Sequence, residues 1–248
     1  MSIILAIFLG LVQGLTEFLP VSSSGHLILF QHLFKMPGDM LLFNIILHLA
    51  TLCAVILVFH KKIWQLVRHP FNKTNLYLVV STAVTCAFVL LFKDFIDRTF
   101  THKILPVTFM LTALVLYAVT IIKPKDKPVT GVTAIAVGLM QGIAVIPGLS
   151  RSGMTISTML ATGTKRQTAA EFSFLMSIPI IIASFLYEML ESGGKLHAEI
   201  LPTAVAFVVA LASGIFAIKF MLHIIQRVNF RWFSLYLVGI AIACLILF

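Results

Sequence analysis

The sequence predicts an all-α polytopic membrane protein with an inverted-topology repeat, in which each half holds one re-entrant helix hairpin and three transmembrane helices. Three observations lead to this prediction. Hydrophobic residues make up 60% and charged residues 11% of the 248 residues, against about 45–50% and about 25% in soluble domains. Six apolar segments are long enough to cross a bilayer. Two further apolar regions are interrupted at matching positions.

The composition also narrows the class of protein. A mean hydropathy of +1.06 excludes a soluble globular enzyme, a disordered chain and a disulfide scaffold. The net charge of +9 is explained by the basic cytoplasmic loops of a membrane protein, so we expect no nucleic-acid partner. The N-terminus has no basic residue before its first apolar run, so we expect it to be retained rather than cleaved as a signal peptide.

The expected membrane segments follow from length and interruption. A full span needs about 20 mainly apolar residues, and the segments that qualify are 41–59, 75–92, 104–122, 172–190, 200–218 and 232–248. Residues 1–35 are broken by Pro20 and residues 22–25, and residues 129–163 by Pro147-Gly148 and residues 150–153. A broken helix survives in lipid only where protein or a wet cavity covers its free backbone groups. Both regions are therefore predicted to be re-entrant helix–loop–helix hairpins.

The two broken regions match each other at a fixed offset of 128 residues. The matched pairs are Gln13 with Gln141, Gly14 with Gly142, Ser22 with Ser150, Ser24 with Ser152, and Gly25 with Gly153. We therefore expect a single membrane domain over residues 1–248, with repeat 1 at about 1–122 and repeat 2 at about 129–248. Because each repeat adds three spans, an odd number, the second half must enter the membrane upside down.

Charged residues predict the orientation. If residues 61–73 are cytoplasmic, alternation places 123–128, 164–171 and 219–231 on the same side, and these four regions hold 12 of the 18 Lys and Arg residues. The outer regions hold Lys35, Lys93, Arg98, Lys103 and Lys195. By the positive-inside rule, both termini are then external. The first hairpin enters from outside, the second from inside, and their tips can meet near the middle of the membrane.

The hairpin tips carry the candidate functional residues. Glu17 follows Gln13 by four residues, so both lie on one helix face inside an apolar run. A carboxylate there needs a polar cavity and a partner. Arg151 is the one basic residue of the two central motifs. It is interpreted either as a structural counter-ion to Glu17 or as an anion clamp, since a guanidinium matches phosphate oxygens bidentately.

Serine and glycine clusters precede the second helix of each hairpin. They are Ser22, Ser24 and Gly25 in the first hairpin and Ser150, Ser152 and Gly153 in the second. Serine at an N-cap satisfies free N–H groups, and the N-terminus of a helix binds phosphate well. Two converging N-termini would suit a diphosphate. Thr155, one turn beyond Arg151, is a further candidate donor to phosphate oxygens.

Two histidines and a cation complete the list of residues and groups considered for the site. His26 lies one turn from Ser22 and Ser23, within reach for base–nucleophile chemistry or direct attack. His48, on the predicted span 41–59, has no such neighbours and is expected to be structural. No P-loop, dinucleotide, CxxC or zinc-protease motif occurs. Glu17 with Gln13 could help bind one hard divalent cation, since Mg²⁺ commonly uses one or two carboxylates plus substrate phosphates.

At these residues the sequence resembles the integral-membrane undecaprenyl-diphosphate phosphatases of the bacitracin-resistance type. Residues 13–17, Gln-Gly-Leu-Thr-Glu, resemble the family's (E/Q)xxxE motif, and residues 18–27 continue the likeness. Residues 147–155, Pro-Gly-Leu-Ser-Arg-Ser-Gly-Met-Thr, resemble its PGxSRSxxT motif, and residues 171–175 are also similar. The first motif position is Gln13, where many members have Glu. The resemblance covers essentially the whole chain.

The resemblance implies hydrolysis of undecaprenyl diphosphate to undecaprenyl phosphate and inorganic phosphate. This reaction recycles a lipid carrier for cell-wall synthesis and confers bacitracin resistance. The resemblance further implies a bacterial plasma (inner) membrane enzyme with an extracytoplasmic active site and a need for a divalent cation, Mg²⁺ or Ca²⁺. A homodimer is left open.

In the expected mechanism, Arg151, the serine clusters and the helix N-termini hold the phosphate oxygens. Glu17 with Gln13 positions the cation. Ser23 attacks with His26 as base, although direct attack by His26, or by a water molecule that it activates, stays open. The alternative function is a transporter or flippase for polyprenyl phosphate, because inverted repeats with broken helices are typical of secondary transporters.

Overall fold

The computed structural model describes residues 1–36, 40–122, 125–191 and 198–248. Lys123 and Lys195, which contribute to the predicted charge distribution, lie outside the described residues. The described part of the chain is all-helical, and its one bridge pair joins Lys127 to Thr164. This confirms the predicted all-α class.

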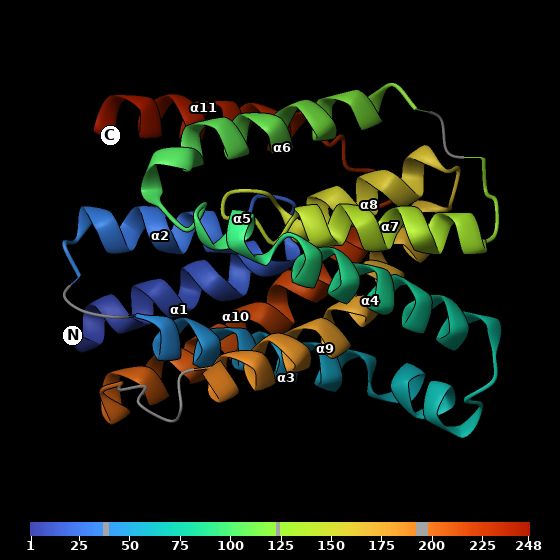
Figure 1. Cartoon of the computed structure of the whole chain (residues 1–248), viewed down its shortest axis with the longest axis horizontal. Helices are drawn as coiled ribbons and strands as arrows, with labels where there is room; N and C mark the ends of the chain where they lie inside the picture. Colours follow the sequence, from blue (N-terminus) through green and yellow to red (C-terminus); the bar gives the residue numbers. More distant parts are fainter. Residues whose placement is uncertain (37–39, 123–124, 192–197) are drawn as a thin grey trace.

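Each interrupted region forms two short helices joined by a turn. The first pair is α1 (Ile3–Phe18) and α2 (Ser23–Leu33), and the second pair is α7 (Gly131–Ile143) and α8 (Arg151–Ala161). Figure 1 shows that α1 and α2 extend inward from the end of the molecule that carries both termini, whereas α7 and α8 extend inward from the opposite end. The turns of the two helix pairs therefore approach each other in the middle of the molecule.

In the described part of the chain, five helices are long and apolar enough to cross a membrane, which indicates a multi-pass membrane protein. They are α3 (Leu41–Arg68), α4 (Lys73–Leu91), α6 (Leu105–Thr120) with the preceding 3₁₀ helix η1 (His102–Ile104), α9 (Arg166–Glu191) and α10 (Ile200–Ile224). The sixth predicted span forms α11 (Arg231–Leu247), whose 17 residues lie at the short end of the about 17–25 residues that span a bilayer. The short α5 (Lys93–Asp97) was not predicted.

The long helices pack around the two hairpins in a reciprocal pattern. Helix α1 packs along α10, and α7 packs along α4, while α3 contacts α9 and α6 contacts α11. Two glycines permit the first two contacts: a Cβ at Gly10 would lie 2.6 Å from the Ala206 carbonyl oxygen on α10, and one at Gly138 would lie 2.6 Å from the Ser81 carbonyl oxygen on α4. Small residues of this kind let backbones approach closely in membrane bundles. Gly10 and Gly138 are 128 residues apart, the offset of the matched motifs.

The turn of the second hairpin is held by α6. Gly148 has a positive φ of 88°, which L side chains rarely adopt. The Thr112 hydroxyl lies 3.3 Å from the Gly148 carbonyl oxygen and 3.2 Å from the Ser150 backbone nitrogen, which donates to it. These contacts set the position from which α8 begins, directly before Arg151.

Candidate active site

The carboxylate of Glu17 is the centre of the polar residues between the two hairpins. Glu17 is 5% exposed, and Gln13, one turn earlier on α1, is fully buried. The Gln13 amide nitrogen donates to Glu17 Oε2 at 3.0 Å. The Ser23 hydroxyl donates to the same oxygen. A buried carboxylate needs such donors, because burying an unpaired charge is strongly unfavourable.

The start of α2 aims Ser23 at Glu17. Ser22 is the N-cap, and its hydroxyl accepts a hydrogen bond from the Gly25 backbone nitrogen at 3.3 Å. Its φ of 68° lies in the left-handed region, which costs of order 1–3 kcal/mol for a non-glycine residue and is typical of functional sites. This backbone turn carries the chain from Pro20 into α2, where Ser23 is the first helical residue.

The second hairpin contributes the positive charge. Ser150 caps α8 and accepts from the Gly153 backbone nitrogen at 3.1 Å. Arg151 follows it and forms an ion pair with Glu17 Oε1, with side-chain exposures of 19% and 3%. The Ser152 hydroxyl also links the two hairpins, because it donates a hydrogen bond to the Leu19 carbonyl oxygen at 3.0 Å. Glu17 and Arg151, which are 134 residues apart in sequence, are thus joined directly.

These residues open onto a cavity of about 320 Å³. Its polar lining includes six of the predicted site residues, namely Glu17, Ser22, Ser23, Ser24, Ser150 and Arg151. Its apolar walls include Ile45 of α3, Phe100, and Ile180 and Phe185 of α9. The lining runs from the hairpin turns to Leu41 and Glu188, near the end of the molecule where both termini lie (Figure 1). The cavity therefore combines polar and charged groups from the hairpin turns with apolar walls.

Five other predicted site residues are buried outside the cavity lining. Gly25, His26, Ser152, Gly153 and Thr155 are buried and do not belong to the cavity lining among the described residues. His26 donates from Nδ1 to the Ser22 carbonyl oxygen at 2.7 Å, and its Nε2 is 2.7 Å from the Tyr236 hydroxyl. The Thr155 hydroxyl lies 2.6 Å from that of Ser173 and joins α8 to α9. In this structure these residues support the turns.

The two polar cavity residues of α3, Asn44 and His48, were not predicted to act at the site. His48, which the sequence suggested to be structural, lines the cavity with Nε2 3.7 Å from Glu17 Oε2. Its Nδ1 donates to the Asn44 carbonyl oxygen at 2.8 Å, and Asn44 also lines the cavity. The four-residue spacing of two polar residues on one face of an apolar span is the signal that could have identified them.

Glu17 and Gln13 offer few ligands to a divalent cation held by protein groups alone, although Gln13 Oε1 is buried without a hydrogen-bond partner among the described residues. Both carboxylate oxygens already accept from protein groups, Oε1 from Arg151 and Oε2 from Ser23 and Gln13. Among the residues that the structure describes, no three His, Cys, Asp or Glu side chains are grouped to hold a metal ion. A guanidinium paired with the carboxylate also opposes a cation there. The chemistry proposed for this site therefore uses no metal held by Glu17 and Gln13.

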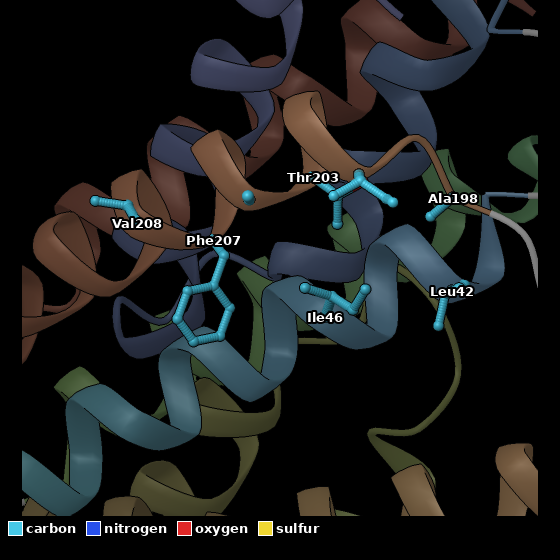
Figure 2. A pocket seen from close by; sticks show the side chains of 8 residues that line it. Leu42, Ile46, Ala198, Thr203, Phe207 and Val208 are labelled. Atoms are coloured by element: carbon cyan, nitrogen blue, oxygen red, sulfur yellow. The ribbon is translucent and has the colours of Figure 1, made fainter.

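A larger cavity of about 470 Å³ lies between α3 and α10. Figure 2 shows Leu42, Ile46 and Phe207 on its walls, with Thr203 beside them. Thr203 is the one residue with a polar side chain among the described residues that line it. Because the described lining of this cavity offers no charged group and a single hydroxyl, that of Thr203, the smaller cavity is the candidate active site.

Comparison with known proteins agrees with this choice. The family model described as "Bacitracin resistance protein BacA" matches residues 6–243. The chain is 40% identical over 250 residues to a protein of Carboxydothermus hydrogenoformans named undecaprenyl-diphosphatase, covering 98% of this chain and 96% of that protein. It is 42% identical over 266 residues to an undecaprenyl-diphosphatase of Treponema denticola, covering 100% and 98% of the two chains. The chain belongs to the bacitracin resistance protein BacA family.

Proposed function

We propose that this chain hydrolyses undecaprenyl diphosphate to undecaprenyl phosphate and inorganic phosphate, and so recycles the lipid carrier and confers bacitracin resistance. The observation that carries the proposal is the joint position of Ser23, Glu17 and Arg151 at the polar end of a cavity with apolar walls. A nucleophile with a base and a guanidinium serve phosphoryl transfer. The apolar walls suit a prenyl tail.

The first chemical step uses Glu17 as the base. The diphosphate binds between Arg151 and the N-termini of α2 and α8, whose free N–H groups attract phosphate. Ser23 Oγ attacks the terminal phosphorus while its proton moves to Glu17 Oε2. The bond from phosphorus to the bridging oxygen breaks, and undecaprenyl phosphate leaves with the electron pair. Glu17 replaces His26 in this role because the Ser23 hydroxyl donates to Glu17, whereas both ring nitrogens of His26 face Ser22 and Tyr236.

The second step hydrolyses the phosphoryl group on Ser23. Water attacks the phosphorus and transfers a proton to a phosphoryl oxygen. The bond from phosphorus to Ser23 Oγ breaks, and Glu17 returns its proton to that oxygen. Inorganic phosphate leaves, and the Glu17 carboxylate regains its ion pair with Arg151. Charge stabilisation by Arg151 supplies most of the catalysis in such a transfer.

The expected Mg²⁺ or Ca²⁺ is proposed to enter with the substrate. Mg²⁺ is commonly bound through substrate phosphates with few protein ligands, and a diphosphate brings four or more oxygens of this kind. The cation would then neutralise charge on the diphosphate. Glu17 and Gln13 would keep the protein hydrogen bonds that they have in the unliganded structure.

The inverted repeat and its orientation are part of the proposal. The repeat is supported by the reciprocal packing of α1 with α10 and of α7 with α4, by Gly10 and Gly138, and by hairpins that extend from opposite ends (Figure 1). The 12 Lys and Arg residues of the four basic regions favour a cytoplasmic position for the end opposite the termini. The cavity then opens to the extracytoplasmic side of the bacterial plasma (inner) membrane. Whether the protein forms a homodimer is tested by measuring the molar mass of the protein in detergent by light scattering.

The deciding experiment is phosphate release from undecaprenyl diphosphate by the purified protein in detergent, with Mg²⁺ and with EDTA. Arg151→Ala serves as the site variant, and monodisperse elution of both proteins controls for folding. Release that needs Arg151 supports the phosphatase. No release by folded wild-type protein would refute it and move the proposal to lipid transport. The two relatives described above carry a phosphatase name, so they lend the transport alternative no support.

A further inference from the structure

Gln141 is a buried cavity residue whose side-chain oxygen has no donor. It lies on α7, is 1% exposed and belongs to the cavity lining. Within the described residues, Gln141 Oε1 is buried without a hydrogen-bond partner. Leaving a buried acceptor unpaired is unfavourable, so such an atom in the lining of the candidate active site points to a donor that the reaction itself supplies.

The orientation of this amide is fixed by its neighbour on α4. Gln141 Nε2 lies 3.2 Å from Thr85 Oγ1. Thr85 has one hydroxyl proton, and the Ser81 and Gly138 carbonyl oxygens, each 2.9 Å away, can take it. Thr85 Oγ1 is therefore an acceptor toward Gln141, which requires the nitrogen of the amide to face Thr85. The oxygen is left as the free atom.

Gln141 and Gln13 occupy matched positions, and the side-chain oxygen of each is buried without a hydrogen-bond partner among the described residues, but their amide nitrogens have different partners. Gln13 uses its amide nitrogen to support the Glu17 carboxylate. The residue that matches Glu17 at the 128-residue offset is Val145, which also lines the cavity. The second hairpin has therefore kept the amide without the acid. The Gln141 amide therefore has a role other than supporting a carboxylate base.

The chemistry of the site selects the missing donor. An ionised phosphate has only acceptor oxygens, so it cannot donate to Gln141 Oε1. A cation held by Gln141 itself is disfavoured because Val145 stands where the first hairpin has its acid, and a cation that enters with the diphosphate is held by the phosphate oxygens. Water can donate, and the proposed reaction consumes one water molecule for each turnover. In other phosphoryl-transfer enzymes a glutamine amide orients the attacking water.

We propose that Gln141 Oε1 accepts a hydrogen bond from the water molecule that hydrolyses phosphoryl-Ser23, and so directs the water oxygen at the phosphorus. This inference rests on the proposed function. Ser23 and Gln141 come from different hairpins and line the same cavity, and the attacking water must lie opposite Ser23 Oγ across the phosphorus. Bonds and protons balance as in the second step above: the amide is a positioning group and takes no proton.

The test separates the two chemical steps. Wild-type protein and the variants Gln141→Met, Gln141→Glu and Gln167→Met are mixed with undecaprenyl diphosphate labelled in its terminal phosphate, and quenched at short times. Methionine keeps the length of glutamine but has no comparable acceptor. Gln167 of α9 is the matched control, because its amide nitrogen also donates to a side chain, Glu171 Oε1 at 2.9 Å, outside the cavity lining. Undecaprenyl phosphate, free phosphate and labelled protein are measured separately.

In Gln141→Met we expect about one equivalent of undecaprenyl phosphate in the first turnover, label retained on Ser23, and phosphate release slowed by about tenfold or more, which corresponds to about 1.4 kcal/mol. Gln141→Glu, which keeps an acceptor, should release phosphate faster than Gln141→Met, and Gln167→Met should match the wild type. Melting temperatures check that each variant is folded.

Four results would overturn the inference. Equal slowing of both products in Gln141→Met would make the residue a diphosphate-binding group, and an unaffected Gln141→Met would remove any role. Gln141→Glu as slow as Gln141→Met would mean that the acceptor oxygen is not what matters. Turnover by Ser23→Ala would mean that no phosphoryl-Ser23 exists to be hydrolysed. Failure of the proposed function itself is distinguishable, because the folded wild-type protein would then release neither product.

Discussion

Replacing Gly148 by alanine tests how the turn of the second hairpin is held. The residue has a φ of 88°, a left-handed conformation that costs an L-residue about 1–2 kcal/mol. A Cβ at this position would also lie 1.9 Å from Thr108 Oγ1 and 2.9 Å from Thr108 Cβ on α6. Overpacking of this kind costs about 1–3 kcal/mol. We therefore expect Gly148→Ala to lower the free energy of unfolding by about 2–5 kcal/mol.

The assay is thermal unfolding in detergent. A destabilisation of 1 kcal/mol lowers Tm by about 2–4 °C in chains of 150–250 residues, so Gly148→Ala should lower Tm by about 4–20 °C. In a Thr108→Ala background the contact with the hydroxyl is removed while the 2.9 Å contact with the Cβ of residue 108 stays, so the same substitution should cost less than in the wild type but more than the about 1–2 kcal/mol of backbone strain. Gly239→Ala in α11 is the control, because its Cβ would meet nothing within 4 Å.

Phosphate release should fall together with Tm in Gly148→Ala, because this turn sets the positions of Ser150 and Arg151. A Gly148→Ala protein that melts within about 2 °C of wild type, below the expected shift of about 4–20 °C, would refute the reasoning. An equal cost with and without Thr108 would show that the clash is not relieved by removing the hydroxyl. In that case the strain of the backbone and the contact with the Cβ of residue 108 would account for the loss.

Three further outcomes follow from the site. Glu17→Gln should lower kcat by about 10²–10⁴-fold, the usual contribution of a general base; near-normal turnover would exclude Glu17 from that role. Arg151→Lys should not restore the activity lost in Arg151→Ala, since lysine lacks the planar fork that pairs with Glu17 and phosphate; initial rates at saturating lipid decide this. EDTA should reduce phosphate release, yet Mg²⁺ should leave the Tm of the substrate-free protein unchanged, and a rise on Mg²⁺ addition would contradict a cation that enters with the diphosphate.

Much of the candidate site could be predicted from single residues. Glu17 and Arg151 are charges inside apolar regions, and such charges must find partners, so their ion pair follows one of the two readings of Arg151. The breaks at Pro20 and Pro147 likewise predict where the helices stop, because proline removes a donor and clashes with the preceding turn. The structure ends α1 at Phe18 and α7 at Ile143.

The role of His26 could not be read from its neighbours in the chain. A residue one turn from Ser22 and Ser23 lies on the same helix face, but rotamer and packing choose its partner. Here Nδ1 donates to the Ser22 carbonyl oxygen, and the ring stacks on Tyr236 from α11, with centroids 5.7 Å apart. Glu17 lies six residues before Ser23, on the other side of a turn with a left-handed residue. Local spacing carries no information about such a turn.

The sequence by itself determined the all-helical class, the two interrupted helix pairs and the charged residues at their turns. These features depend on local chemistry: apolar length, proline and glycine breaks, and the cost of a charge in lipid. Tertiary structure alone decided which groups meet. It places His48 and Gln141 in the cavity lining, points the Ser23 hydroxyl at Glu17 and leaves Thr155 buried outside the cavity lining. Such contacts join residues from helices that are distant in sequence, so they depend on how the helices pack and on where each turn points.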